Sequence, residues 1–263
     1  MKVAFSKPTR DNPERRALFS RFRASGYDGL QLKNAQYREY IDLPARFIDA
    51  WGRETGVASG LITGGRLDAA GVATLRHMFT FAQAVGSERV IFCHSLPRQG
   101  LSSTDIAGFA KTLSDLGKEA RQHGTVLSLH HHYDQPVMYR RDFDVFFDAV
   151  DDRAVTLTVD TAHLVKSGID DIAGVLRDFR EVIDNVHLKD IADGDFKVLG
   201  QGHIDFAPVF STLDEIGYRG WLCADEESGS DLLGAMETCH QFITSALAAP
   251  KRNDRPSDNV SNQ

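Results

Sequence analysis

Carboxylate and imidazole side chains follow one buried apolar run of this chain at close spacing. Asp160 ends the run Val155–Asp160, and His163 comes three residues later. A carboxylate that closes a buried strand must be paired or bind a cation, because an isolated buried charge is costly. An imidazole nearby can bind the same cation or move a proton. These residue types predict a functional site rather than polar residues that merely end a strand.

Similar side chains follow other short apolar runs of the sequence. Six of the ten histidines fall at the ends of four successive runs, together with lysine and carboxylate residues. Histidines in helical segments (His77, His123 and His240) are interpreted as satisfied polar residues, the loop residue His203 stays open, and Cys93 is interpreted as packing. The polar run ends are Cys93-His94, His130-His131-His132, Asp160-Thr161-Ala162-His163, His187-Leu188-Lys189-Asp190 and Asp225-Glu226-Glu227.

The elements that must position these residues are strands alternating with helices along the chain. Alternation of this kind predicts a parallel sheet, and eight units predict closure into a single (β/α)8 TIM barrel spanning residues 1–249. A doubly wound open sheet is the rival, but no GxGxxG motif follows the first strand. A short helix is expected near Leu43–Gly52. The strand candidates are Val3–Ser6, Gly29–Leu32, Val57–Ile62, Val90–Cys93, Val126–His130, Val155–Asp160, Asn185–Leu188 and Trp221–Asp225.

In such a barrel the active site lies at the carboxyl ends of the strands, where the polar residues gather. Side chains alternate along a strand between the barrel interior and the helix layer. The polar sets that share one parity are therefore expected to point inward, and their apolar neighbours to face the helices. The inward sets are Ser128, His130 and His132; Asn185, His187 and Lys189; and Cys223, Asp225 and Glu227.

Composition excludes several other classes of protein. The chain of 263 residues is 42% hydrophobic and has 16 phenylalanines, as in one globular domain with a large core. Its three cysteines form no CxxC motif, which indicates reduced thiols in a cytoplasmic protein. No secretory signal or membrane span is visible, and a net charge of −7 disfavours nucleic acid. The polar tail 250–263 is expected to be disordered.

Five stretches in the second half resemble the xylose isomerase-like barrel superfamily, often called sugar phosphate isomerases/epimerases. They are most similar to its inosose dehydratase-like branch. The first half fits this superfamily only as a pattern of strands and helices. The stretches are Leu127–His132, Val159–His163, Asn185–Asp190, Gly200–Phe206 and Gly217–Leu222.

The resemblance implies one divalent metal ion held by one residue from each of strands five to eight. In this sequence these residues are His130, Asp160, His187 and Asp225. His130 stands where many members have Glu, and Asp225 is one methylene shorter than the usual Glu. Glu226 or Glu227 is therefore an alternative ligand, and strand parity favours the latter. Two imidazoles and two carboxylates suit Mn, Co, Fe or Zn better than Mg or Ca.

The implied chemistry is enolisation next to the carbonyl group of a keto-sugar or keto-cyclitol. Superfamily epimerases use two metal-bound glutamates, and the missing strand-five glutamate favours one-face isomerisation or β-elimination over epimerisation. His163 is the expected acid/base, Lys189 an oxygen-binding residue and Glu227 a reserve base, while His132 and His94 are expected to contact substrate. The resemblance also implies a homo-oligomer. A sugar epimerase, an endonuclease IV-like phosphodiesterase and a non-catalytic barrel subunit remain alternatives.

Overall fold

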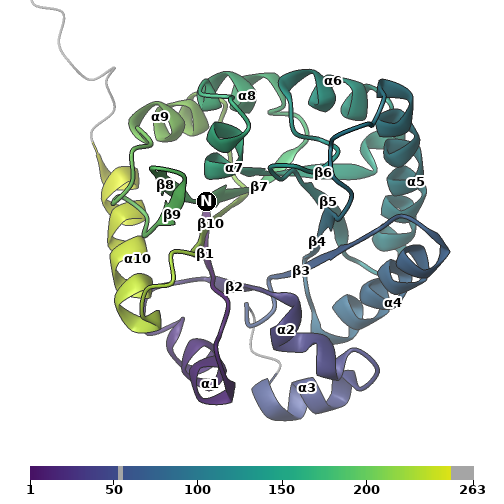
Figure 1. The fold of residues 1–263 in the computed structure, drawn as a ribbon. Helices are drawn as coiled ribbons and strands as arrows, with labels where there is room; N and C mark the ends of the chain where they lie inside the picture. The colour runs from purple at the N-terminus through teal and green to yellow at the C-terminus, as the bar shows by residue number, and fades with distance from the viewer. Residues whose placement is uncertain (53–55, 250–263) are drawn as a thin grey trace, which may run out of the picture.

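Eight parallel strands close into a barrel in the computed structural model, which describes residues 1–52 and 56–249 (Figure 1). This confirms the predicted single (β/α)8 TIM barrel. The predicted disorder of residues 250–263 lies outside the described residues. In their order around the barrel the strands are β1 (Lys2–Ser6), β10 (Trp221–Asp225), β7 (Ile183–Leu188), β6 (Val155–Asp160), β5 (Val126–His130), β4 (Arg89–His94), β3 (Gly60–Gly65) and β2 (Gly29–Leu32).

Helices form a ring around the strands (Figure 1). A small antiparallel hairpin, β8 (Asp190–Ala192) and β9 (Asp195–Lys197), follows β7. Within the described part of the chain, no helix combines the length and apolar character needed to cross a membrane. The helices are α1 (Asn12–Arg21), α2 (Asn34–Tyr37), η1 (Arg38–Tyr40), α3 (Pro44–Trp51), α4 (Ala69–Val85), α5 (Ser103–Gln122), α6 (Arg140–Asp148), η2 (Asp151–Arg153), α7 (Thr161–Lys166), α8 (Ile172–Asp178), α9 (Ala207–Glu215) and α10 (Leu232–Ala248).

The helix starts follow the capping residues in the sequence. Asp11 accepts a hydrogen bond from the backbone N–H of Glu14 at the start of α1, and proline occupies its first turn. Ser102 and Asp105 form the capping box that begins α5. The short helix expected near Leu43–Gly52 is α3.

The third strand lies further along the chain than predicted. Val57–Ile62 was the expected range, whereas β3 is Gly60–Gly65 and pairs along its whole length with β4. Val57 and Ala58 are buried in the core before the strand begins. The strand itself ends in Thr63-Gly64-Gly65. Because glycine is depleted in strands, the residue types do not predict where this strand ends.

The two faces of the barrel wall differ in chemistry, as parity predicts. The outward side chains Leu127, Leu129, Val186, Leu188 and Leu222 belong to the main hydrophobic core. Ala4, Trp221 and Cys223 form a separate apolar cluster. Polar side chains with at most 1% exposure also fill the barrel interior, namely Gln31, Ser128, Thr158 and Asn185. The strand ends that carry the candidate site residues therefore lie next to a barrel interior that is filled by polar side chains.

Candidate metal and substrate site

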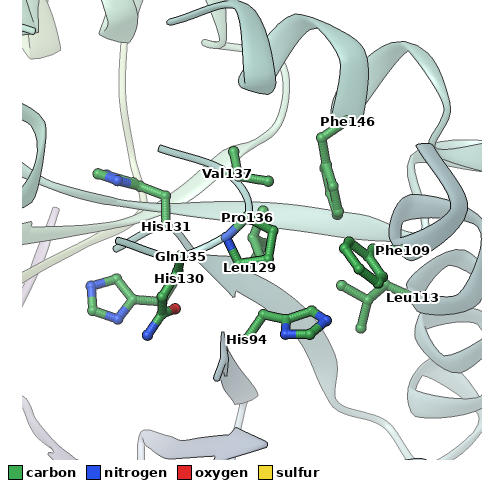
Figure 2. Close-up of a pocket in the computed structure, with 10 residues that line it drawn as sticks. All are labelled: His94, Phe109, Leu113, Leu129, His130, His131, Gln135, Pro136, Val137 and Phe146. Carbon is green, nitrogen blue, oxygen red and sulfur yellow. The ribbon is translucent and has the colours of Figure 1, made fainter. Parts of the chain in front are cut away.

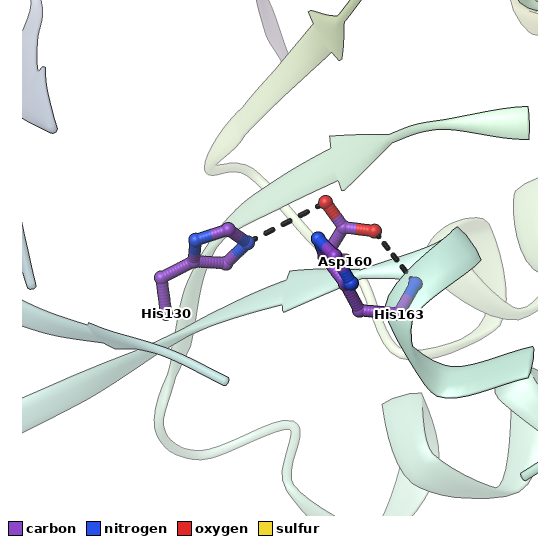
Figure 3. A group of neighbouring side chains, drawn as sticks. All are labelled: His130, Asp160 and His163. Carbon is purple, nitrogen blue, oxygen red and sulfur yellow. Dashed lines mark hydrogen bonds and ion pairs between the residues drawn. The ribbon is translucent and has the colours of Figure 1, made fainter. Parts of the chain in front are cut away.

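Asp160 ends β6 and connects the barrel wall to the short helix α7. Its Oδ1 accepts a hydrogen bond of 3.0 Å from the backbone N–H of His163, which caps the helix (Figure 3). Its Oδ2 faces the barrel axis, 3.4 Å from Nε2 of His130 and 3.6 Å from Nζ of Lys189. The side chain is fully buried. One oxygen thus holds the backbone, and the other is available to a cation.

His187 and Asp225 reach the same point from the neighbouring strands. Asp160 is in register with His187 on β7, and His187 is in register with Cys223 on β10. Nδ1 of His187 lies 3.9 Å from Oδ2 of Asp160 and 3.6 Å from Oδ2 of Asp225. Nε2 of the same ring lies 2.8 Å from Oε1 of Gln31. Both side chains are inaccessible, so these distances belong to a buried centre.

Two ammonium groups neutralise the carboxylates on the β10 side. Nζ of Lys189 lies 2.6 Å from Oδ2 of Asp225 and 2.8 Å from Oε2 of Glu227. Nζ of Lys33, which directly follows β2, lies 2.6 Å from Oδ1 of Asp225 and 2.7 Å from Oε1 of Glu227. Each carboxylate therefore contacts both lysines. Close pairing of this kind is what permits several charges in a buried space.

Charge and burial set the protonation of the centre. Burial alone would raise the pKa of Asp160, but Lys189 and the neighbouring imidazoles hold it well below its usual range. Burial opposes the charged form of Lys189, yet Asp225, Asp160 and Glu227 raise its pKa well above normal. Burial lowers the pKa of His187 to about 3 and also lowers the pKa of His163. These two imidazoles are therefore neutral at pH 7 and can offer a lone pair.

Two overlapping groups of side chains are close enough to share a metal ion, with all ligand atoms of each group within 4.8 Å of one another. One group is Asp160, His187 and Asp225, and the other is His130, Asp160 and His163. Nδ1 of His187 and both ring nitrogens of His163 are buried without a hydrogen-bond partner among residues 1–52 and 56–249. Neutral nitrogen and carboxylate donors of this kind fit a divalent transition metal. The four expected ligands are thus divided between two groups that share Asp160, and His163 belongs to the group that contains His130.

The histidine triplet divides between the two faces of β5. His130 points inward, where Nδ1 lies 3.0 Å from Sγ of Cys93. His131 points outward and packs on Phe143, while its Nε2 accepts a hydrogen bond of 2.9 Å from the backbone N–H of Asp160. The ring of His132 packs on His163, with centroids 3.6 Å apart. His130 therefore belongs to the centre, His131 supports the backbone of Asp160, and His132 packs beside His163.

His94 lies apart from the other expected site residues. Its ring packs on Phe109, with centroids 4.5 Å apart, and lines a small cavity between the barrel wall and the helix layer. Figure 2 shows this ring on the Phe109 side of the cavity, away from the ring of His130. Its Nδ1 accepts a hydrogen bond from the backbone N–H of Leu96. The position suits packing rather than substrate contact, so His94 is left out of the site.

The connection after β7 covers one side of the centre. The carboxylate of Asp190 accepts hydrogen bonds from the backbone N–H groups of Gly200, Gly202 and Ile204. A Cβ atom at Gly202 would lie 2.2 Å from Oδ1 of Asp190, so this position requires glycine. This loop also includes His203, whose backbone N–H donates to the hairpin. The motif Gly200–Phe206 therefore supplies the backbone N–H groups that hold this loop on Asp190.

The hairpin places an aromatic ring at the centre. The ring of Phe196 lies 5.4 Å from that of His163 and 4.7 Å from Nζ of Lys189. The face of this ring attracts the lysine ammonium and excludes water from one side of His163. Phe196 thus forms an apolar wall beside the candidate acid/base.

Sequence reasoning missed Gln31 on the second strand and Lys33 directly after it, and it interpreted Cys93 as packing. Inward parity along Gly29–Leu32 and the strand-end position of Lys33 are the signals that point to them. For the β10 carboxylates the parity argument agrees with the geometry. Glu227 contacts both lysines of the centre, whereas Glu226 forms a buried ion pair with Lys7.

Comparisons with known proteins identify the family of this chain. Residues 17–244 match the family described as xylose isomerase-like TIM barrel. Inosose dehydratase of Clostridium tetani is 38% identical over 137 residues, which are 45% of this chain and 46% of that protein. The aligned part thus spans about half the length of the inosose dehydratases that this chain matches.

Two solved structures share the fold. The 3-keto-D-glucoside 4-epimerase YcjR from E. coli superposes with a TM-score of 0.69 at 19% identity, covering 94% of this chain and 98% of that one. An IOLI protein solved with a zinc atom gives a TM-score of 0.70 at 17% identity, with the same coverage. The match over residues 17–244 confirms the family resemblance expected from the five motifs.

Proposed function

Because the chain belongs to the xylose isomerase-like TIM barrel family, we propose that it is a metal-dependent lyase or isomerase for a keto-cyclitol or keto-sugar. The reaction begins with removal of a proton from the carbon beside the carbonyl group. One observation carries the proposal: the buried Nδ1 of His187 faces carboxylate oxygens of Asp160 and Asp225. The similarity to inosose dehydratase supports a cyclitol substrate, and the zinc atom of the IOLI protein supports a metal.

Asp160, His187 and Asp225 would hold the ion, with His130 or His163 completing the set. A bound divalent ion supplies Lewis-acid polarisation of a substrate carbonyl. Both ring nitrogens of His163 lack a hydrogen-bond partner within the described structure, so one of them can take a proton from the substrate and return it. Lys189 is positioned to hold a substrate oxygen.

Glu227 is the second group able to accept a proton. Burial and Asp225 oppose its charged form, but Lys33 and Lys189 outweigh them and lower the pKa of Glu227. It is therefore ionised at neutral pH. Either Glu227 or His163 can remove the substrate proton, and the same group can then return that proton to the leaving hydroxyl group. The carbon–hydrogen and carbon–oxygen bonds break, the double bond forms and water leaves, which suits elimination on one face of the substrate.

Elimination or one-face isomerisation is preferred to epimerisation. Epimerisation by proton transfer needs a base on each face of the substrate carbon. On strand five, His130 is held between Cys93 and Asp160, so this strand presents no free carboxylate to a second face. Sugar epimerisation, as in the E. coli structural neighbour, remains the second candidate. The net charge of −7 disfavours the phosphodiesterase alternative.

The test is incubation of the metal-reconstituted protein with a keto-inositol in deuterated water. Mass spectrometry would follow loss of one water, and NMR would follow deuterium at the carbon beside the carbonyl. Dehydration, lost in His187→Ala, is the expected outcome. Deuterium exchange with inversion and no loss of water would favour the epimerase. Absence of both reactions across keto-cyclitols and keto-sugars would favour the non-catalytic barrel.

A further inference from the structure

A line of hydrogen bonds, buried beyond its partly exposed first residue, crosses the barrel interior beneath the candidate site. It begins at a carboxylate on β7, passes through hydroxyl groups on β5 and β6, and ends at an imidazole on β7 through an amide pair. The steps are Ser128 Oγ to Asp184 Oδ1 at 3.2 Å, Thr158 Oγ1 to Ser128 Oγ at 2.7 Å, Asn185 Nδ2 to Thr158 Oγ1 at 3.2 Å, Gln31 Nε2 to Asn185 Oδ1 at 2.8 Å, and His187 Nε2 to Gln31 Oε1 at 2.8 Å.

The first residue of this line enters the barrel because of a strand irregularity. Leu157 pairs with Ile183 and Thr158 pairs with Asn185, so Asp184 has no partner on β6. Such bulges redirect a side chain. The carboxylate of Asp184 contacts the guanidinium of Arg89 at 3.3 Å through one oxygen and Ser128 through the other.

The carboxylate fixes the direction of the hydroxyl hydrogen bonds. A carboxylate paired with a guanidinium accepts hydrogen bonds and donates none, so Ser128 donates its only hydroxyl proton to Asp184. Ser128 must then accept from Thr158, whose own proton is thereby used. The oxygen of Thr158 is left as an acceptor, and it must receive an N–H group from Asn185.

The same argument extends through the amide pair. Because Asn185 presents its Nδ2 to Thr158, its Oδ1 accepts from Nε2 of Gln31, and Oε1 of Gln31 faces His187. An amide oxygen only accepts, so Nε2 of His187 must carry the ring proton. Nδ1 of the neutral ring is then bare, and this is the nitrogen that faces Asp160 and Asp225.

We propose that this buried line is a tautomer-setting device, in which Asp184 acts through Ser128, Thr158, Asn185 and Gln31 to keep Nδ1 of His187 free of a proton. These five are positioning residues, because they act through His187 and not on a substrate. The inference rests on the proposed function only in assigning a divalent cation to Nδ1. Without the line, Nδ1 would donate its proton to the adjacent carboxylates and be unable to bind a cation. Partners of this kind typically change metal affinity by about 10–100-fold.

The tautomer can be measured in the metal-free full-length protein labelled with ¹⁵N-histidine. Two-bond ¹H–¹⁵N correlation spectra distinguish the Nε2–H form from the Nδ1–H form of each ring. The wild type should show the Nε2–H form for His187, assigned by comparison with His187→Gln. Thr158→Val keeps the shape but removes the hydroxyl group, and it should add the Nδ1–H form. Thr158→Ser should restore the wild-type spectrum.

A matched control is available on the same strand. Thr156→Val makes the same change at a hydroxyl group with no hydrogen-bond partner in the described residues, and it should leave the tautomer unchanged. Zinc affinity, measured by competition with a chelating dye, should fall about 10–100-fold in Thr158→Val and stay unchanged in the two controls. An Nδ1–H form in the wild type, or an unchanged tautomer in Thr158→Val, would overturn the inference. The expected tautomers without any zinc binding would instead leave the inference standing and contradict the proposed function.

Discussion

The Nδ1 atom of His187 lies 3.6 Å from Oδ2 of Asp225, and the two atoms share no hydrogen bond. Both are acceptors when the ring proton is on Nε2, so the contact is stable only with a positive charge nearby. Nζ of Lys189 provides this charge at 2.6 Å from the same carboxylate oxygen. A divalent ion at this oxygen must therefore compete with an ammonium group of the protein itself.

Lys189→Met is expected to increase the affinity for zinc or manganese. Like unit charges about 4 Å apart repel by about 4 kcal/mol at an effective dielectric constant of about 20, so removing the ammonium should strengthen binding by at least about tenfold. Isothermal titration calorimetry on the metal-free protein measures this directly. Lys166→Met is the control, because that exposed lysine contacts the ring of Phe196 and none of the proposed ligands. Weaker binding in Lys189→Met would show that the lysine supports the ion instead of competing with it.

Glu227→Gln is expected to slow proton removal while leaving metal content unchanged. The amide keeps the shape of the side chain but cannot accept a proton, and removal of a positioned acid/base typically costs about 10²–10⁴-fold in rate. Exchange of substrate hydrogen with deuterated water gives the rate, and elemental analysis gives the metal content. Glu215→Gln, at the surface ion pair with Arg177, is the matched control. A normal exchange rate in Glu227→Gln would assign the base to His163.

Acid should destabilise the protein partly through His94. Burial, with a contribution from Arg66, lowers the pKa of this imidazole from 6.5 to about 4. As the pH falls, the unfolded chain binds the proton first, so stability is unaffected above about pH 6.5 and is lost progressively down to about pH 4. His94→Leu should therefore show a smaller fall in Tm between pH 7 and pH 4.5 than the wild type. The exposed His77→Leu should follow the wild-type curve, and an identical fall in His94→Leu would contradict this assignment.

The alternation of strands and helices was sufficient to predict the barrel. Strand parity also placed His130 and His187 on the side of the wall that faces the centre, because each alternates with leucine or valine along its strand. Glu227 lies just past β10 and continues the parity of Cys223 and Asp225. The third strand lies further along the chain than predicted because it ends in Gly64-Gly65, and glycine is depleted in strands. Hydrophobic pattern thus predicts which way a strand faces where the two faces differ in polarity.

Parity fails where both faces are apolar. Along β4, Val90 and Phe92 alternate with Ile91 and Cys93, so the sequence does not show which set points inward. The structure pairs Ile91 with the inward Ser128, which brings Cys93 to His130 and sends His94 outward. Pairing between strands decides this orientation, and a single sequence does not contain it.

Contacts between side chains on opposite sides of the barrel could not be predicted from the sequence either. Gln31 and His187 are 156 positions apart and lie on strands that are not neighbours in the sheet. Lys33 reaches Asp225 over a separation of 192 positions. Only closure of the barrel makes these side chains meet, so their roles follow from the structure.

The central claim is a divalent metal at His187 and Asp160, and elemental analysis of the purified protein tests it most directly. The wild type, reconstituted with manganese, cobalt or zinc and then desalted, should retain about one equivalent. His187→Ala and Asp160→Ala should lose it, while the same substitution at His123, on the surface after α5, should retain it. A wild-type protein that holds no metal after reconstitution would contradict the account.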